Sequence, residues 1–173
     1  MNLPNKLTLA RIIAVPFFII AYMKQYFIVA LVIFVLASLT DMLDGKIARK
    51  YNLITNFGKI MDPLADKILV YAAFCLMVAD KTIPAWTLII ILCREFLVAG
   101  IRTVAASTGT VIAADMAGKI KTVLQMVATC LLIIKDYHVF FSYTGYILFY
   151  ASLVMTAYSG INYCVKNKEV FKG

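Results

Sequence analysis

Charged residues, histidine and cysteine are scarce in this chain of 173 residues, and each scarcity argues against a class of function. Charged residues make up 15% of the sequence and hydrophobic residues 63%, whereas soluble domains are about 45–50% apolar. The single histidine, His138, follows Asp136 closely and lies far along the chain from most other acidic residues, which argues against histidine-based acid–base chemistry. The four cysteines fall in separate apolar runs without a Cys-x-x-Cys pair, so we expect small buried residues with free thiols.

The chain is instead rich in apolar runs of the length that crosses a lipid bilayer, which is about 20 residues with a range of about 17–25. Six runs are predicted to be transmembrane helices: 7–23, 26–40, 63–79, 84–106, 120–134 and 141–165. The second and fifth are short unless their helices continue into polar neighbours at 41–50 and 117–119. We therefore expect an all-α, polytopic membrane protein with six transmembrane helices, forming a single domain over residues 1–173.

Lysine and arginine are divided unequally between the two ends of these runs. With the N-terminus in the cytoplasm, 13 of them fall on the cytoplasmic side and three, Lys24, Lys81 and Lys135, fall on the outer side. This excess predicts that both termini are cytoplasmic. The net charge of +8 then reflects topology and attraction to anionic lipid headgroups. Nucleic-acid binding is not expected, because the basic residues are spread along one membrane edge.

Two acidic pairs, Asp41 with Asp44 and Asp62 with Asp66, stand 18 residues apart and account for four of the nine acidic residues. A charged side chain at the bilayer centre costs about 2.5–3.5 kcal/mol by the less severe estimates, so such residues usually have a function. Residues three or four apart share a helix face, so each pair can direct both carboxylates to one place. Together they predict an all-oxygen site for Mg²⁺, Mn²⁺ or Ca²⁺. Pro63 is expected in the first turn of its helix, where the helix dipole would favour Asp62 and Asp66.

Small residues and an arginine border the acidic pairs. Gly45, Ala48 and Gly58 remove side chains where a flat group can approach the backbone. The planar guanidinium of Arg49 suits a phosphate. This combination predicts a nucleotide-diphosphate site at the membrane surface. The competing interpretation is that the acids only form interfacial ion pairs with neighbouring lysines and arginines.

The run Asp41-x2-Asp44-Gly45-x2-Ala48-Arg49-x8-Gly58-x3-Asp62-x3-Asp66 resembles the signature of the CDP-alcohol phosphatidyltransferase family at every position. The resemblance implies a six-helix fold in the cell membrane, usually a homodimer among membrane lipids, with its active site near the cytoplasmic face. It implies transfer of a phosphatidyl or related group from a CDP-linked lipid to an alcohol, with release of CMP. It implies Mg²⁺ or Mn²⁺ as the cofactor, bound by Asp41, Asp44, Asp62 and Asp66. It further implies that Asp66 is the catalytic base and that the CDP group is bordered by Gly45, Ala48, Arg49 and Gly58.

The acceptor alcohol is predicted from other parts of the chain. Residues 2–11, 62–67, 94–102 and 118–125 resemble the branch of the family that uses CDP-diacylglycerol and sn-glycerol 3-phosphate. A dianionic acceptor needs cations near the metal site, and the candidates on the inner parts of the fourth and fifth runs are Arg94, Arg102, Lys119 and Lys121. Arg94 is about midway along its run, where a charge normally faces a cavity or a partner. Glu95 is adjacent in sequence and is expected to point elsewhere on the helix.

Several alternatives stay open. Lys119 and Lys121 can be topology markers alone, and Arg102 can extend to the membrane interface on its long stem. The same chemistry with another alcohol would make the protein a cardiolipin, phosphatidylserine or phosphatidylinositol-phosphate synthase. A small cation transporter could also carry four carboxylates, but it predicts acids near the bilayer midplane and internal repeats, and the sequence shows neither.

Overall fold

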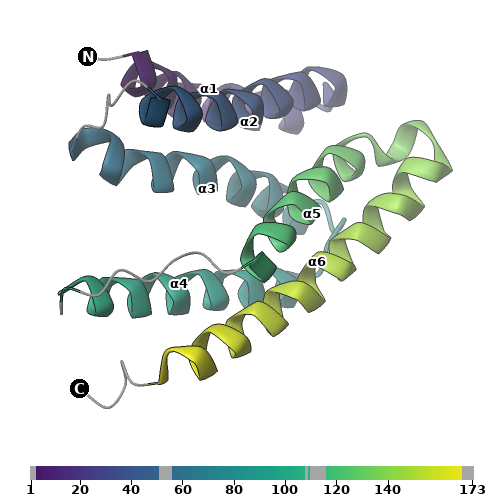
Figure 1. Ribbon diagram of the computed structural model, residues 1–173. Helices are drawn as coiled ribbons and strands as arrows, with labels where there is room; N and C mark the ends of the chain where they lie inside the picture. The colour runs from purple at the N-terminus through teal and green to yellow at the C-terminus, as the bar shows by residue number, and fades with distance from the viewer. Residues whose placement is uncertain (1–2, 51–55, 108, 110–115, 169–173) are drawn as a thin grey trace.

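The computed structural model describes residues 3–50, 56–107, 109 and 116–168, without the side chains of residues 3–4, 41–50, 56–60, 62, 63 and 66. The described part contains the α-helices α1 (Leu3–Met23), α2 (Phe27–Lys50), α3 (Asn56–Ala79), α4 (Ala85–Ser107), α5 (Met116–Ile133) and α6 (Val139–Lys166), and the short 3-10 helix η1 (Lys135–Tyr137). Helices α1 to α4 run alongside one another, and the antiparallel pair of α5 and α6 crosses them obliquely (Figure 1). The all-α class is confirmed.

The six helices coincide with the six predicted runs to within one residue at several ends and extend beyond them at others. Helix α2 continues to Lys50 and α5 begins at Met116, so polar neighbours complete both short runs, as predicted. The predicted start of α3 was wrong. This helix begins at Asn56, which places Asp62 and Pro63 after its first turn. Hydropathy marks the part of a helix that lies in lipid, whereas its hydrogen-bonded turns continue into the interface. The expected dipole benefit to Asp62 and Asp66 therefore has no basis, because that effect is confined to the first turn.

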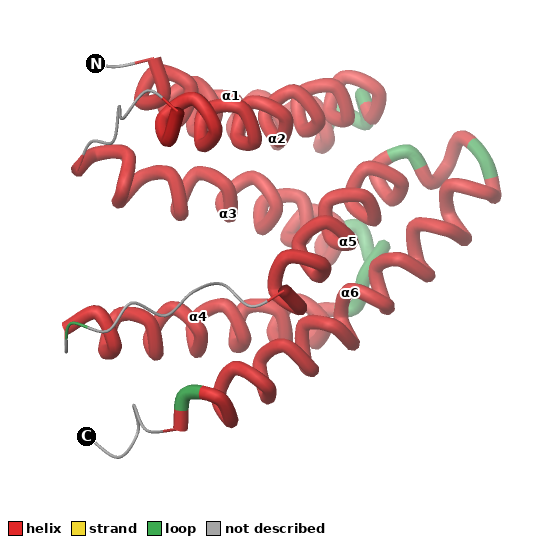
Figure 2. The backbone as a smooth tube through the Cα atoms, viewed as in Figure 1, coloured by secondary structure: helices red, strands yellow, loops and turns green. Residues whose placement is uncertain are grey.

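The chain reverses direction at the predicted breaks. Gln25, between α1 and α2, has φ 61°, and Lys81, between α3 and α4, has φ 63°. The turns between α1 and α2, α3 and α4, and α5 and α6 lie at one end of the molecule, on the right in Figure 2. The start of α1 and the end of α6 lie at the opposite end. The described chain therefore begins and ends on the same side.

The apolar core lies toward the end that carries these three turns. The rings of Phe18 and Phe34 pack with centroids 5.9 Å apart, and those of Phe74 and Phe149 pack edge to face at 5.7 Å. All four side chains are completely buried. They come from the ends of α1 and α3 and the beginnings of α2 and α6. Toward the opposite end, a smaller apolar cluster of Val98, Ile101 and Tyr163 joins α4 to α6.

The outer surface is apolar, as a lipid-facing surface should be. Phe17 is 60% exposed and Val154 69% exposed, which is unusual as a general pattern for a soluble protein. The prediction that every cysteine is buried was wrong, because Cys75 and Cys93 lie on the surface, although all four thiols are free. An exposed thiol is tolerated here because the surface itself is apolar.

Three described helical segments are long and apolar enough to cross a membrane: Asn5–Met23, Met116–Ile133 and Val139–Lys166. Shorter apolar segments cover Phe27–Thr40 and Lys67–Ala79. These segments mark the chain as a membrane protein. Helix α4 falls in neither group, and its middle and second half carry Arg94, Glu95 and Arg102.

Candidate functional site

The acidic pairs lie on two helices that follow one another in the chain. Asp41 and Asp44 belong to the second half of α2, and Asp62 and Asp66 to the first half of α3. Because each pair lies within a continuous helix, its two members share a face. The chemistry of this donor set, four carboxylates, fits a hard divalent cation.

The side chains of these four aspartates lie outside the described residues. For Gly45, Ala48, Arg49 and Gly58, the structure describes only their places in α2 and α3. Among the side chains that the structure does describe, no three His, Cys, Asp or Glu residues lie close enough to hold a metal ion. The predicted metal and CDP contacts therefore stay predictions.

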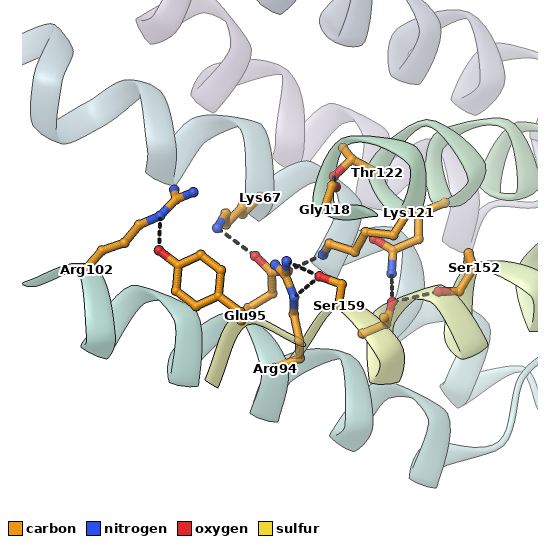
Figure 3. A network of polar contacts seen from close by, with 12 residues as sticks. Lys67, Arg94, Glu95, Arg102, Gly118, Lys121, Thr122, Ser152 and Ser159 are labelled. Carbon is orange, nitrogen blue, oxygen red and sulfur yellow. Dashed lines mark hydrogen bonds and ion pairs between the residues drawn. The ribbon is translucent and has the colours of Figure 1, made fainter. Parts of the chain in front are cut away.

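Glu95 is the centre of a polar network that joins three helices (Figure 3). Its Oε1 accepts hydrogen bonds from Arg94 Nη1 at 2.8 Å and from Lys121 Nζ, and its Oε2 accepts one from Lys67 Nζ at 2.7 Å. These residues come from α3, α4 and α5. Glu95 is 8% exposed and Lys121 is 4% exposed. We call Lys67, Arg94, Glu95 and Lys121 the Glu95 cluster.

The expectation that Glu95 points away from Arg94 was wrong, since the two side chains form an ion pair. Helix geometry fixes the direction of each Cα–Cβ bond, but the long side chain of Arg94 bends back toward its neighbour. Three positive groups and one negative group leave the cluster with a net charge of +2. Burying any of these charges alone would be costly, so each depends on the others.

A cavity of about 90 Å³ opens beside the cluster, and Lys67, Glu95 and Lys121 all line it. Ala37 on α2 also lines it, one helical turn before Asp41. Lys67 directly follows Asp66 on α3. The cavity therefore adjoins the helix segments that carry both acidic pairs.

Arg11 on α1 adds a further buried cation to this cavity wall. Its side chain is 2% exposed, and its Nε donates to the carbonyl oxygen of Ala37 at 3.2 Å. The positive lining is thus drawn from three helices, α1, α3 and α5, while α4 contributes the carboxylate of Glu95. Such a lining attracts anions into a confined space.

The structure brings together two of the four cations predicted for the acceptor site. Arg94 and Lys121 meet on Glu95, whereas Lys119 is exposed, since residues two apart on a helix face nearly opposite directions. Arg102 Nε donates to Tyr163 Oη at 3.2 Å, and its guanidinium carbon lies 5.8 Å from the centre of that ring. Figure 3 shows Arg102 apart from the Glu95 cluster, toward the end of α4.

Lys67 is the one cation of the cluster that was not identified from the sequence as an acceptor residue. Its position directly after Asp66 was the available signal, because a cation beside the predicted base can hold an anionic substrate there. From the sequence it was counted among the cytoplasmic charges, as a possible ion-pair partner of the acidic pairs and as part of the stretch 62–67 that carries the resemblance. Its side chain is 41% exposed and therefore remains accessible from the cavity mouth.

The chain belongs to a family of membrane transferases, the CDP-alcohol phosphatidyltransferases, whose family model matches residues 1–158. Relatives in several bacteria carry the name CDP-diacylglycerol–glycerol-3-phosphate 3-phosphatidyltransferase. The one from Bacillus subtilis (strain 168) is 42% identical over 189 residues, covering 99% of this chain and 97% of the relative. The one from Rickettsia felis is 36% identical over 176 residues, covering 98% and 97%. The one from Salmonella typhimurium (strain LT2) is 36% identical over 172 residues, covering 94% and 92%.

Because the buried charges depend on one another, removing the carboxylate of Glu95 should destabilise the folded protein. Glu95→Leu leaves Lys121 buried without its carboxylate, which should cost about 3–5 kcal/mol. Adding Lys121→Met removes the unpaired charge, so the double variant should recover a large part of the loss. Denaturant titration of the purified protein in detergent measures the unfolding of Glu95→Leu, Lys121→Met and the double variant.

The matched control is the ion pair of Lys135 and Asp136, with an N–O distance of 3.5 Å and a 65% exposed carboxylate. Lys135→Met and Asp136→Leu should show a coupling below about 1 kcal/mol. Additive losses from Glu95→Leu and Lys121→Met would contradict the interdependence of the cluster.

Proposed function

We propose that this protein transfers the phosphatidyl group of CDP-diacylglycerol to sn-glycerol 3-phosphate, giving phosphatidylglycerophosphate and CMP. Its family membership and the names of its relatives support the reaction. The observation that supports a phosphate-bearing acceptor is the Glu95 cluster, and the names of the relatives favour glycerol 3-phosphate over inositol phosphate. Its net charge of +2 matches a phosphate monoester, which carries a charge of about −2 at neutral pH. Serine and phosphatidylglycerol carry no phosphate monoester, so neither matches the net charge of this cluster.

We further propose that residues 1–173 form one domain with six transmembrane helices and both termini in the cytoplasm. The antiparallel helix order supports this topology, as does the position of Lys24, Lys81 and Lys135 in or beside the turns at one end. The active site then lies on the cytoplasmic side of the cell membrane, where a soluble glycerol phosphate is accessible. The family resemblance supports a homodimer surrounded by membrane lipids.

The proposed CDP-lipid site consists of the residues of the family signature on α2 and α3. Asp41, Asp44, Asp62 and Asp66 hold Mg²⁺ or Mn²⁺, and Arg49 contacts a phosphate beside Gly45, Ala48 and Gly58. A bound divalent ion supplies neutralisation of the diphosphate and polarisation of the attacked phosphorus. The small residues leave space for the nucleotide to approach the helix backbone.

The proposed reaction is a direct displacement. Asp66 accepts the proton of the acceptor hydroxyl, whose oxygen forms a bond to the phosphatidyl phosphorus. The bond from that phosphorus to the CMP oxygen breaks, and CMP leaves with the electron pair. A positioned general base contributes about 10²–10⁴-fold to such a rate. Lys67 is the next residue along α3, and in this proposal an acceptor phosphate held by Lys67 brings the acceptor hydroxyl within reach of Asp66.

Arg94, Lys121 and Lys67 are the proposed direct contacts of the acceptor phosphate. Arg102 and Lys119 remain predictions from the sequence. Their side chains are exposed, so in this proposal they supply positive potential at the entrance that draws the dianion inward.

An acceptor screen tests the function. Purified protein in detergent is given CDP-diacylglycerol and one acceptor at a time: glycerol 3-phosphate, serine, phosphatidylglycerol or inositol phosphate. We expect CMP release with glycerol 3-phosphate in Mg²⁺ or Mn²⁺, and its loss when a chelator removes the metal. CMP release with another acceptor and none with glycerol 3-phosphate would refute the proposal.

The role of Asp66 is tested by Asp66→Asn, which keeps the size of the side chain but removes its basicity. Turnover should fall by at least about 10²-fold, the low end for loss of a general base, while binding of CDP-diacylglycerol is largely kept. Asp136→Asn in η1, at the opposite end of the molecule, is the control and should be fully active. Near-normal turnover of Asp66→Asn would exclude Asp66 as the base.

The acceptor contacts are tested by substituting two lysines of α5, of which one is buried and one is exposed. Lys121→Gln should raise the KM for glycerol 3-phosphate about ten- to a hundred-fold, as expected for loss of one charge-assisted hydrogen bond, and leave the KM for CDP-diacylglycerol unchanged. Lys119→Gln, two residues away and exposed, should have a much smaller effect. Equal losses in the two variants would show that burial in the Glu95 cluster does not define the acceptor site.

A further inference from the structure

Two glycines on different helices make room for the side chain of Arg94. A β-carbon at Gly118 on α5 would lie 2.9 Å from Arg94 Nη2, and one at Gly160 on α6 would lie 3.1 Å from Arg94 Cγ. Ordinary van der Waals contact lies at 3.4–4 Å. Any larger residue at either position would therefore displace the arginine, at its tip in one case and along its stem in the other.

Ser159, next to Gly160, completes this space. Its side chain is fully buried, and its Oγ accepts hydrogen bonds from Arg94 Nε at 3.2 Å and from Arg94 Nη2 at 2.5 Å (Figure 3). We call Gly118, Ser159 and Gly160 the Arg94 slot. Together with the bond from Arg94 Nη1 to Glu95, the slot fixes the plane of the guanidinium.

The fixed guanidinium still has donors for a ligand. A guanidinium carries five N–H groups, and the contacts with described residues engage Nε, Nη1 and Nη2 once each. Two N–H groups remain, on a side chain that is 11% exposed and bound to a carboxylate that lines the cavity. A guanidinium held in one orientation binds phosphate better than a free one, because little side-chain freedom is lost on binding.

We propose that Gly118 and Gly160 are positioning residues of the acceptor site. They admit Arg94 between α5 and α6, so that Ser159 and Glu95 hold its guanidinium in the orientation that meets the acceptor phosphate. The inference rests on the proposed function of this site. Glycine lowers helix stability relative to alanine, and the space required by Arg94 explains why α5 and α6 carry glycine at these two positions.

Gly118→Ala is the most direct test. The atom it displaces is the far end of a flexible side chain, so the variant should fold normally while the guanidinium moves. We expect the KM for glycerol 3-phosphate to rise about tenfold or more, since a displacement of about 1 Å in a site can cost up to about 10²-fold. The KM for CDP-diacylglycerol should not rise, and the thermal unfolding temperature should not fall. Gly160→Ala, which displaces the stem, should act in the same direction.

Gly100→Ala is the matched control, because an added β-carbon there meets nothing within 4 Å. Its kinetic constants should match those of the wild type. A second comparison places Gly118→Ala in an Arg94→Lys background, where the Nη2 atom is absent. The added alanine should then have little further effect on the acceptor KM. Equal effects in both backgrounds would show that Gly118 does not act through Arg94 and would overturn the inference.

The remaining outcomes separate this inference from the proposed function. Absence of glycerol 3-phosphate-dependent CMP release by the wild type would overturn the proposed function, and the inference with it. An active wild type with Gly118→Ala and Gly160→Ala indistinguishable from Gly100→Ala would overturn the inference alone. A lower unfolding temperature with an unchanged acceptor KM would assign the glycines to helix packing, which also overturns it.

Discussion

The site depends on one buried carboxylate shared by three cations. Glu95 contacts Lys67 from α3, Arg94 from its own helix and Lys121 from α5. A buried charge without a partner is strongly destabilising, so these three helices must pack in the register that brings the four side chains together. The contact therefore constrains the relative rotation of α3, α4 and α5 in a region where apolar side chains supply little specificity, because lipid is as apolar as they are.

The apolar core and the polar site lie toward opposite ends of the molecule. The phenylalanine core around Phe18, Phe34, Phe74 and Phe149 lies toward the end with the three tight turns and holds the helices together there. Toward the other end, apolar packing is reduced to a small cluster of Val98, Ile101 and Tyr163 beside the polar contacts, and a cavity opens next to the segments that carry the acidic pairs. An enzyme that joins a lipid substrate to a soluble one needs this division, since the reacting groups must meet at the membrane surface while the acyl chains stay in lipid.

Much of the fold was predictable because its signals are local. The apolar runs located all six helices, and the chain reversals at Gln25 and Lys81 lie at the predicted breaks. The start of α3 was missed because hydropathy follows lipid contact, whereas a helix continues wherever its backbone hydrogen bonds can form. The spacing of the aspartates and glycines on α2 and α3 identified the family, because a helical site on consecutive segments leaves a fixed pattern along the chain.

By itself, the sequence determined the helical class, the acidic signature and the cations available for an anionic acceptor, because each is carried by residue type and short-range spacing. Only the tertiary structure decided which cations act together. It joined Arg94 and Lys121 through Glu95, added Lys67, and left Lys119 on the surface. It also placed Gly118 and Gly160 against Arg94. Apart from the adjacent pair Arg94 and Glu95, these contacts join residues 24–66 positions apart, and they depend on helix rotation and side-chain reach, which spacing along the chain does not encode.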